Sequence, residues 1–211
     1  MAAEKVLTMN GYDMFEVVSA LQKCIRRGDE KGAMHWGVEM FVSGFAPYAW
    51  KRLIIISMED IGLANPWAPV VVKTYKDIYD DMTKDDKKNQ FRLPYVQAIL
   101  YLVHSPKSRH TDWAQGYWFD EVMWCGGKMP IPDCALDIHT RRGKMLGKTI
   151  EDFFTDGSVV ANHKVQENEE FYKEMCHKRW GGKEWSDYVE KVKNERETKV
   201  KVESQLGLFD D

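Results

Sequence analysis

The sequence predicts an all-α fold, and three observations carry this prediction. Apolar residues recur at intervals of three and four along several stretches, which is the spacing of one helical face. Residue types that cap, start or stop helices (Asp, Pro and Gly) stand at the ends of these stretches. Convincing runs of alternating apolar and polar residues, the pattern of a half-buried strand, are missing, and so is an internal repeat.

The first half of the chain has the clearest helical periodicity. Asp13 and Asp29 are expected to be N-caps, and Pro47 fits a first turn. Gly44 and Gly126 follow periodic stretches and are expected to stop helices. The expected helices run from Asp13 to Arg27, from Asp29 to Gly44, from Pro47 toward Gly62, from Asn65 toward Met82, from Phe91 to Leu102 and from Thr111 to about Cys125. A charged loop is expected over residues 83–90.

The pattern changes after Lys128, where Pro130 and Pro132 open a segment of irregular periodicity. Short helices and turns are expected there, followed by a helix over 166–179 and a mostly polar one over 183–202. We therefore expect a compact multi-helix domain with a divergent second half and a flexible C-terminal tail. The predicted divisions are 1–127, 128–182 and 183–211.

Composition describes a globular protein, with 44% hydrophobic and 30% charged residues in 211. The formal net charge of −3 gives the whole molecule no attraction to nucleic acid or to an anionic membrane, so DNA contact needs a local basic patch. The longest apolar run, Leu53–Ile56, is far shorter than the roughly 18 residues of a membrane span. The N-terminus lacks the long apolar run of a signal peptide.

The cysteines are scattered and form no C-x-x-C pair, so a structural zinc site is not expected. They are Cys24, Cys125, Cys134 and Cys176. Cysteines in this pattern are typical of the reduced cytoplasm, where we expect the protein to act.

Gly147-Lys148-Thr149 invites comparison with a phosphate-binding loop, but the comparison fails. That motif needs a glycine five positions before its GKT glycine, and here the position holds Arg142. No apolar strand leads into the segment either. We expect no nucleotide and no other cofactor.

Asp133, Asp137 and His139 are the candidates for a metal site. On an extended segment Asp137 and His139 would lie near one ion, whereas on a helix they point apart. A hydrogen-bonded structural role is preferred, and a metal-dependent enzyme is kept as a less favoured alternative. No serine-nucleophile elbow is present. No catalytic residue is assigned, and the chain is predicted not to be an enzyme.

Two basic clusters are candidates for phosphate contact, although a solvated face is the usual and preferred explanation of such runs. One contains Lys107 and Arg109, and the other contains Arg141, Arg142, Lys144 and Lys148. Aromatic residues gather on the expected sixth helix, at Trp113, Tyr117, Trp118 and Trp124. Helical spacing spreads them over more than one face, so we expect one face to join the core and another to meet a partner. Exposed aromatics beside the basic clusters would make a DNA-binding module, which is the second hypothesis.

Three segments resemble the RarA/MgsA family, called Werner-helicase-interacting proteins in eukaryotes. Residues 24–36 resemble the family's "SIRGSDPDAALYW" stretch, residues 57–66 its "SEDIGLADP", and residues 105–108 its "SPKS". They occur in the family's order and at about its spacing. The likeness is good from Tyr12 to His110 and departs from the common family form after Met129.

The resemblance implies the helical region that in this family follows an AAA+ ATPase module and forms tetramers, in proteins that act at stalled replication forks. It implies a stand-alone version of that region, with itself, DNA or a RarA-type ATPase as partners. The signature residues are Glu59, Asp60, Gly62 and Pro66. We expect a carboxylate at 59 or 60 to pair with Arg26 or Arg52, or to cap the next helix, and Gly62 to need a positive φ.

The tail resembles the bacterial sliding-clamp-binding pentapeptide, commonly written QL(S/D)LF. Its residues are Gln205, Leu206, Gly207, Leu208 and Phe209. A polar side chain for a pocket rim and apolar side chains for a cleft suit a docked peptide. A bacterial-type clamp is therefore expected before a ring such as PCNA, with a tail folded onto its own domain as the alternative. Taken together, the sequence predicts a non-enzymatic oligomeric scaffold in DNA replication, recombination or repair, recruited to a clamp.

Overall fold

The structure is a computed structural model that describes residues 6–85, 91–180 and 194. The chain divides into two compact units, Met1–Lys128 and Met129–Asp211, each of which is described by itself. The described residues form helices and turns with one isolated bridge, between Leu7 and Asp13, and no strand. The all-α prediction is therefore confirmed.

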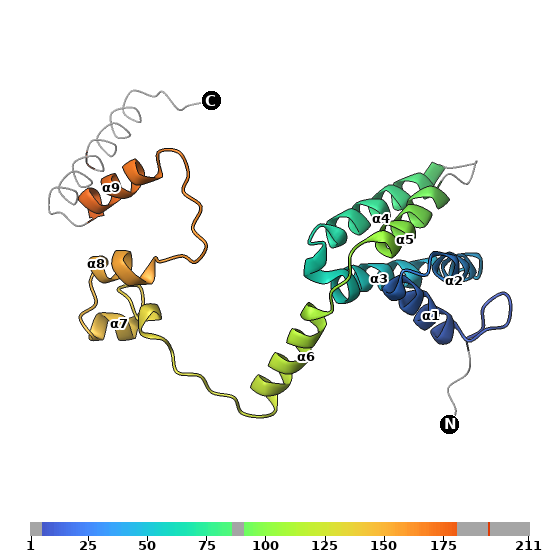
Figure 1. The fold of residues 1–211 in the computed structure, drawn as a ribbon, viewed down its shortest axis with the longest axis horizontal. Helices are drawn as coiled ribbons and strands as arrows, with labels where there is room; N and C mark the ends of the chain where they lie inside the picture. The colour runs from blue at the N-terminus through green and yellow to red at the C-terminus, as the bar shows by residue number, and fades with distance from the viewer. Residues whose placement is uncertain (1–5, 86–90, 181–193, 195–211) are drawn as a thin grey trace, which may run out of the picture. The chain divides into compact units, whose positions relative to one another are not determined.

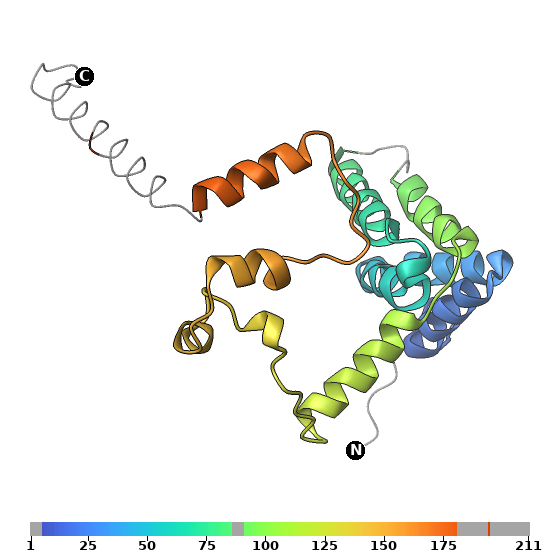
Figure 2. The same cartoon turned by 60° about the vertical axis from the view of Figure 1, so that its left-hand side comes forward.

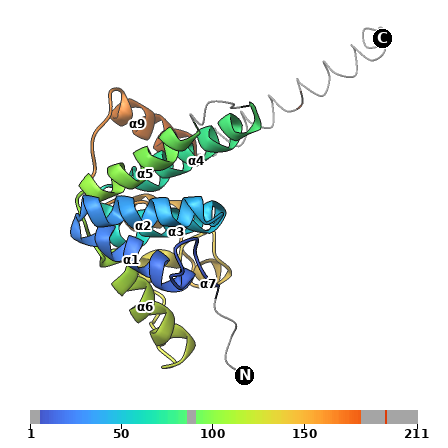
Figure 3. The ribbon, with the colours of Figure 1, turned by 90° about the vertical axis from the view of Figure 1, so that its right-hand side faces the viewer.

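The first unit is a helical bundle from which a last helix projects (Figures 1 and 3). Its α-helices are α1 (Met14–Arg27), α2 (Glu30–Val42), α3 (Ala46–Ile56), α4 (Ala68–Asp85), α5 (Arg92–His104) and α6 (His110–Met123). Two short elements join α3 to α4: the π-helix η1 (Ser57–Ile61) and the 3-10 helix η2 (Gly62–Ala64).

Local chemistry sets the ends of α1. The Asp13 carboxylate accepts hydrogen bonds from the backbone amides of Phe15 and Glu16, which have no partner within the helix. At the other end Gly28 adopts the left-handed conformation (φ 72°), which glycine tolerates without steric cost. Between these ends an apolar stripe that includes Leu21 and Ile25 is fully buried.

The core lies where α5 packs against α2, α3 and α4. Trp50 and Tyr95 are its largest buried side chains, and their rings meet at 5.3 Å between centroids. The Tyr95 hydroxyl donates to the carbonyl of Gly37 at 2.9 Å, so its polar end is satisfied within the core. A Cβ at Gly37 would come within 2.4 Å of the Ile99 side chain, so a larger residue there would require Ile99 to move.

The region after α3 differs from the prediction of one helix running toward Gly62. The α-helix ends at Ile56, and the chain widens into the π-helical turn η1. This turn brings Ser57, Asp60 and Ile61 inward together, and each is fully buried. Periodicity cannot reveal such a turn, since the contacts that stabilise it come from residues distant in sequence.

The second unit consists of short elements joined by loops, drawn yellow to orange in Figure 2. They are η3 (Asp133–Ala135), α7 (Arg141–Met145), α8 (Ile150–Asp152), η4 (Phe153–Gly157) and α9 (Glu169–Trp180). Leu136 is buried, and Gly143 lies so close to the Asp137 carbonyl that a Cβ would approach its oxygen to 1.9 Å. The helix expected over 166–179 is α9, whereas the one expected over 183–202 lies outside the described residues.

Across the described part of the chain, no helix combines the length and the apolar character needed to cross a membrane.

Candidate functional site

A buried carboxylate links three segments of the first unit. Asp60 is fully buried in η1, and its Oδ2 accepts a hydrogen bond from the Gln22 side chain at 2.9 Å. Its Oδ1 accepts from Nε of Arg26, and this bond, with the nearby charges, raises the pKa of Arg26. Arg52 reaches the carboxylate indirectly, by donating to the Gln22 side-chain oxygen at 3.2 Å. Of the two arginines expected to pair with the signature, Arg26 makes the direct contact.

Arg109 connects this cluster to α6. Its guanidinium pairs with Asp112 in the first turn of α6 and lies 3.5 Å from Oε1 of Glu59. Its Nε is buried 3.9 Å from the Asp60 carboxylate, and none of the described residues gives it a hydrogen-bond partner. The guanidinium also covers the Trp113 ring at 4.8 Å, a cation–π contact. We name the residues Gln22, Arg26, Glu59, Asp60 and Arg109 the carboxylate cluster.

Gly62 lets the segment before α6 approach this cluster closely. Its φ is +50°, and a Cβ there would come within 2.8 Å of the Ser108 carbonyl oxygen. The backbone amide of Ser108 donates to the carbonyl of Asp60 at 2.9 Å, which ties the two segments together. Pro66 lies in the turn that precedes α4. The signature residues Glu59, Asp60 and Gly62 thus contact the segment from which α6 begins.

The first basic cluster is held by contacts within the chain. The ammonium of Lys107 donates to the carbonyls of Leu102 and Val103 at 2.9 and 2.8 Å, and so caps the C-terminal end of α5. Burial lowers the pKa of Lys107. Lys107 and Arg109, the two residues of this cluster, thus both make contacts within the chain.

The second basic cluster lies on the second unit. Arg141, Arg142 and Lys144 are exposed on α7, while Lys148 pairs with Asp133 at 2.6 Å. Gly147 takes a positive φ of 73° after α7. Thr149 then caps α8: its side chain accepts from the Asp152 amide, and the Asp152 side chain accepts from the Thr149 amide in return. The GKT segment therefore acts as a turn between helices, which accounts for its residues without a phosphate.

Two of the three candidate metal ligands, Asp137 and His139, contact each other, and the third, Asp133, has another partner. Asp137 accepts from the backbone amide of His139 at 2.9 Å and lies 3.0 Å from its Nδ1. These hydrogen bonds lower the pKa of Asp137. Asp133 is engaged with Lys148 instead. Among the residues that the structure describes, no group of three or more His, Cys, Asp or Glu side chains is arranged to hold a metal ion.

The aromatic helix α6 contains no buried residue, which corrects the expectation that one of its faces joins the core. Its apolar residues form three pairs four positions apart, and each pair shares a face: Trp113 with Tyr117, Trp118 with Val122, and Phe119 with Met123. Successive residues turn by about 100°, so the pairs point in three directions. All six side chains are at least half exposed.

Charge on α6 is all of one sign. The helix carries Asp112, Asp120 and Glu121 and no lysine or arginine. Sequence reasoning identified Trp113, Tyr117, Trp118 and Trp124 on this segment but missed Phe119, Val122 and Met123, which complete the other faces. The signal that identifies them is the i, i+4 pairing itself.

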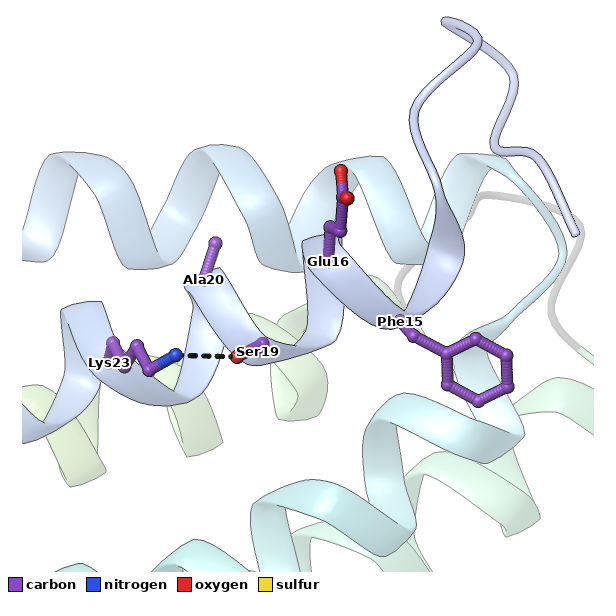
Figure 4. Close-up of a pocket in the computed structure, with 5 residues that line it drawn as sticks. All are labelled: Phe15, Glu16, Ser19, Ala20 and Lys23. Atoms are coloured by element: carbon purple, nitrogen blue, oxygen red, sulfur yellow. Dashed lines mark hydrogen bonds between the residues drawn. The ribbon is translucent and has the colours of Figure 1, made fainter. Parts of the chain in front are cut away.

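The described residues form several surface hollows. One of about 470 Å³, shown in Figure 4, is lined by Phe15, Glu16, Ser19, Ala20 and Lys23, all from α1. Lys23 there donates to the Ser19 hydroxyl at 2.9 Å (Figure 4). Because one helix supplies every lining residue, this is a depression on a helix surface rather than a cleft between elements. The clamp-like tail residues Gln205, Leu206, Gly207, Leu208 and Phe209 lie outside the described residues.

Comparison with known proteins identifies the kind of chain this is. A family model described as "MgsA AAA+ ATPase C terminal" matches residues 28–203. The match therefore includes the second half, where the sequence departs from the common family form. The replication-associated recombination protein A of Bacillus subtilis is 30% identical over 139 residues, which are 65% of this chain and 31% of that protein.

Two further relatives give the same picture. The ATPase WRNIP1 of Dictyostelium discoideum is 29% identical over 138 residues, which are 64% of this chain and 15% of that protein. An AAA domain-containing protein of Mycobacterium tuberculosis is 40% identical over 139 residues, which are 65% and 30% of the two chains. The matched part of this chain thus spans less than a third of each of these relatives.

Proposed function

Because the chain belongs to the family of MgsA AAA+ ATPase C-terminal regions, we propose that it is a non-catalytic, homo-oligomeric scaffold in DNA replication, recombination or repair. The names of its relatives supply the process, since they include replication-associated recombination proteins. The single observation that carries the scaffold is α6, a helix with apolar pairs on three faces and no buried residue. A helix that is apolar all round is normally buried on several sides.

The area of this surface fits a stable assembly. The aromatic side chains at Trp113, Tyr117, Trp118, Phe119 and Trp124 are 51% to 75% exposed. At about 200 Å² for a whole aromatic side chain, they offer on the order of 600 Å². One partner of a standard interface contributes about 800 Å². Because a two-fold dimer covers one face of a helix, three apolar faces favour an assembly larger than a dimer, and we propose a tetramer.

The charge of α6 favours a protein partner over nucleic acid. Single-stranded DNA stacks on aromatic side chains where neighbouring cations meet its phosphates. On α6 the neighbours are Asp112, Asp120 and Glu121, which repel phosphate, and the one adjacent arginine, Arg109, is already paired. The exposed basic residues of α7 belong to the other unit.

Light scattering tests the scaffold, with the charge-introducing variant Trp118→Glu as the probe. We expect the wild-type chain to have about four times the mass of one copy, and the variant to remain folded but to assemble to a lower mass. The matched control is Lys23→Glu, which changes charge on the exposed face of α1 and should assemble as the wild type does. A wild-type mass of a single copy at micromolar concentration would contradict the proposal.

Recruitment to a sliding clamp is the second part of the proposal, and the sequence of residues 205–209 supports it. Burial of Leu208 and Phe209 is worth roughly 1.5–3 kcal/mol each before ordering costs, which gives a single tail about micromolar affinity. Several tails on one assembly gain by avidity on a ring with several pockets. Deletion of residues 205–211 should abolish clamp binding in surface plasmon resonance and leave the melting temperature unchanged. A melting temperature several degrees lower, with clamp binding unaffected or absent in both forms, would show a structural tail.

DNA binding through the second basic cluster is a second candidate function, favoured by the exposure of Arg141, Arg142 and Lys144 on one short helix. Phosphate contacts release counterions, so affinity should fall steeply with salt. Replacement of the three residues by alanine should weaken binding equally for all DNA sequences and flatten the salt slope. Binding that withstands a fourfold rise in salt would contradict this candidate.

A further inference from the structure

The glycines inside the helices differ in what surrounds them. A Cβ at Gly32 would meet the Asp29 carboxylate at 2.4 Å, and one at Gly37 would meet the Ile99 side chain at 2.4 Å. A Cβ at Gly143 would meet the Asp137 carbonyl at 1.9 Å. Atoms of the chain itself therefore occupy the space beside these three glycines. Gly116, in the middle of α6, has no atom of the described residues within 4 Å of the position of a Cβ.

Glycine is a poor choice for the middle of an exposed helix. It weakens the helix relative to alanine, because it loses more backbone freedom on folding and packs no side chain. Gly116 has helical backbone dihedrals without a positive φ, so conformation does not require it either. The remaining physical use of glycine in a helix is to let another backbone come close.

The neighbours of Gly116 form a notch on α6. Residues three and four positions away share its face, and these are Asp112, Trp113, Phe119 and Asp120. Trp113 and Phe119 are 67% and 64% exposed and stand on either side of the glycine along the helix. The notch thus has a floor without a side chain, two aromatic walls and a carboxylate at each end.

From this geometry we infer that a second copy of the chain crosses α6 at Gly116, with the two α6 helices antiparallel about a two-fold axis. The inference rests on the proposed oligomeric function and names the point at which two copies meet. In such a pair, residues equally far before and after Gly116 face one another. Phe119 of each copy then packs beside Trp113 of the other.

Charge distinguishes the two possible directions of crossing. In a parallel pair the Asp120 carboxylates of the two copies would face each other and repel. In the antiparallel pair Asp120 of one copy meets Asp112 of the other, and that carboxylate is already neutralised by Arg109. The Arg109 guanidinium also covers Trp113, so the charge that balances Asp112 lies beside this aromatic wall of the notch. In the antiparallel direction the aromatic side chains therefore pack on each other, and the two Asp120 carboxylates do not face each other.

A size series at Gly116 tests this contact by sedimentation equilibrium of the full chain. We expect Gly116→Ala to weaken association and Gly116→Leu to weaken it by about tenfold or more, because each added methyl group holds the backbones apart. Circular dichroism should show unchanged or higher helicity in both variants. The matched control is Gln115→Ala, which raises helix propensity at the neighbouring exposed position without filling the notch, and its association should be as in the wild type.

Gly116→Cys provides a second measurement, made with the four native cysteines replaced by alanine. Cysteines at a two-fold crossing point lie within the roughly 7 Å between Cα atoms that a disulfide allows, so mild oxidation should link two copies. Gln115→Cys should not link them. Wild-type assembly with undiminished association of Gly116→Leu, or without the Gly116→Cys link, would overturn this inference alone. A monomeric wild-type chain would overturn the proposed function together with it.

Discussion

The helices α5 and α6 are alike in sequence character and opposite in their surroundings. Both are rich in large apolar residues and neither confines them to one stripe. Yet α5 buries Tyr95, Ile99 and Leu102 completely, whereas α6 buries no residue at all. In the ribbon, α5 lies beside α4 and α6 projects from the end of the bundle (Figures 1 and 3).

The difference teaches that the apolar content of a helix does not predict how much of its surface is buried within its own unit. The helix α5 packs against α1, α2, α3 and α4 of the same unit. The contacts of α6 are chiefly with η1 and η2, at its first turn. The apolar surface that α5 buries within the unit is matched on α6 by surface that stays exposed, which is why the proposed function rests on α6.

The largest expected effect separates the two helices directly. Tyr95→Ala in α5 should lower the free energy of unfolding by about 3–5 kcal/mol, because it leaves a cavity beside Trp50 and removes the hydrogen bond to Gly37. Trp118→Ala in α6 should change the stability of a dilute single copy by less than about 0.5 kcal/mol. Urea denaturation at a concentration below assembly measures both. Equal losses in the two variants would break the comparison.

The carboxylate cluster sharpens the comparison, because it holds the start of α6 to the bundle. Asp60→Asn should cost about 2–3 kcal/mol, less than a fully buried pair, since Arg26 is partly exposed. Hydrogen exchange should also speed up in the first turn of α6, while the middle of α5 stays protected. The matched variant is Glu59→Gln, whose more exposed pair should cost about 0.5–1 kcal/mol. Unchanged exchange in α6 would mean that the cluster stabilises the bundle alone.

Sequence reasoning predicted the helices well where the determinants are local. The caps Asp13 and Asp29 act as expected, and the periodic apolar residues of α1 and α5 are the buried ones. The family resemblance from Ser57–Pro66 and its companion segments is confirmed. These successes share a cause: caps and periodicity depend on residues within one or two turns of each other.

The remaining features depend on contacts that sequence alone does not give. The π-helical turn η1 exists because Asp60 meets Gln22 and Arg26, residues more than thirty positions away. Arg109 and Lys107 read as a basic cluster in sequence, but in the fold one pairs with carboxylates and the other caps α5. The empty environment of Gly116 is likewise visible only in three dimensions.

A smaller expected effect, on the pH dependence of stability, lies at Glu39, outside both α5 and α6. Glu39 of α2 accepts from the backbone amide and side chain of Asn10, and hydrogen bonds from Thr8 and Asn10 lower its pKa. The folded state therefore releases this proton more readily than the unfolded state, whose carboxyl has a pKa of about 4.5. Its stabilising contribution is present above that pH and is lost as the pH falls through the lower folded value.

The measurement is unfolding free energy against pH for the wild type and Glu39→Gln. The variant should lack this part of the acid slope, and NMR should show the loop over 6–13 responding to acid before α5 or α6. Identical slopes in the two proteins would assign the acid sensitivity to other carboxylates.

The smallest expected effect is at Lys148, where we expect substitution to change nothing. Lys148 pairs with the exposed Asp133 in the second unit, and the turn that contains it is stabilised by Gly147 and Thr149 instead. Exposed ion pairs contribute little to stability. If α6 alone supplies the contact between copies, Lys148→Ala should leave the assembly mass, the melting temperature and clamp binding as they are in the wild type.

The same variant should behave as the wild type in an ATP hydrolysis assay, with turnover at background for both, because the position that a phosphate loop needs as glycine holds Arg142. ATP turnover in the wild type that disappears in Lys148→Ala would show that the turn binds nucleotide after all. A change in assembly mass would show that the second unit shares in the contact, and the contrast between α5 and α6 would then no longer account for oligomerisation.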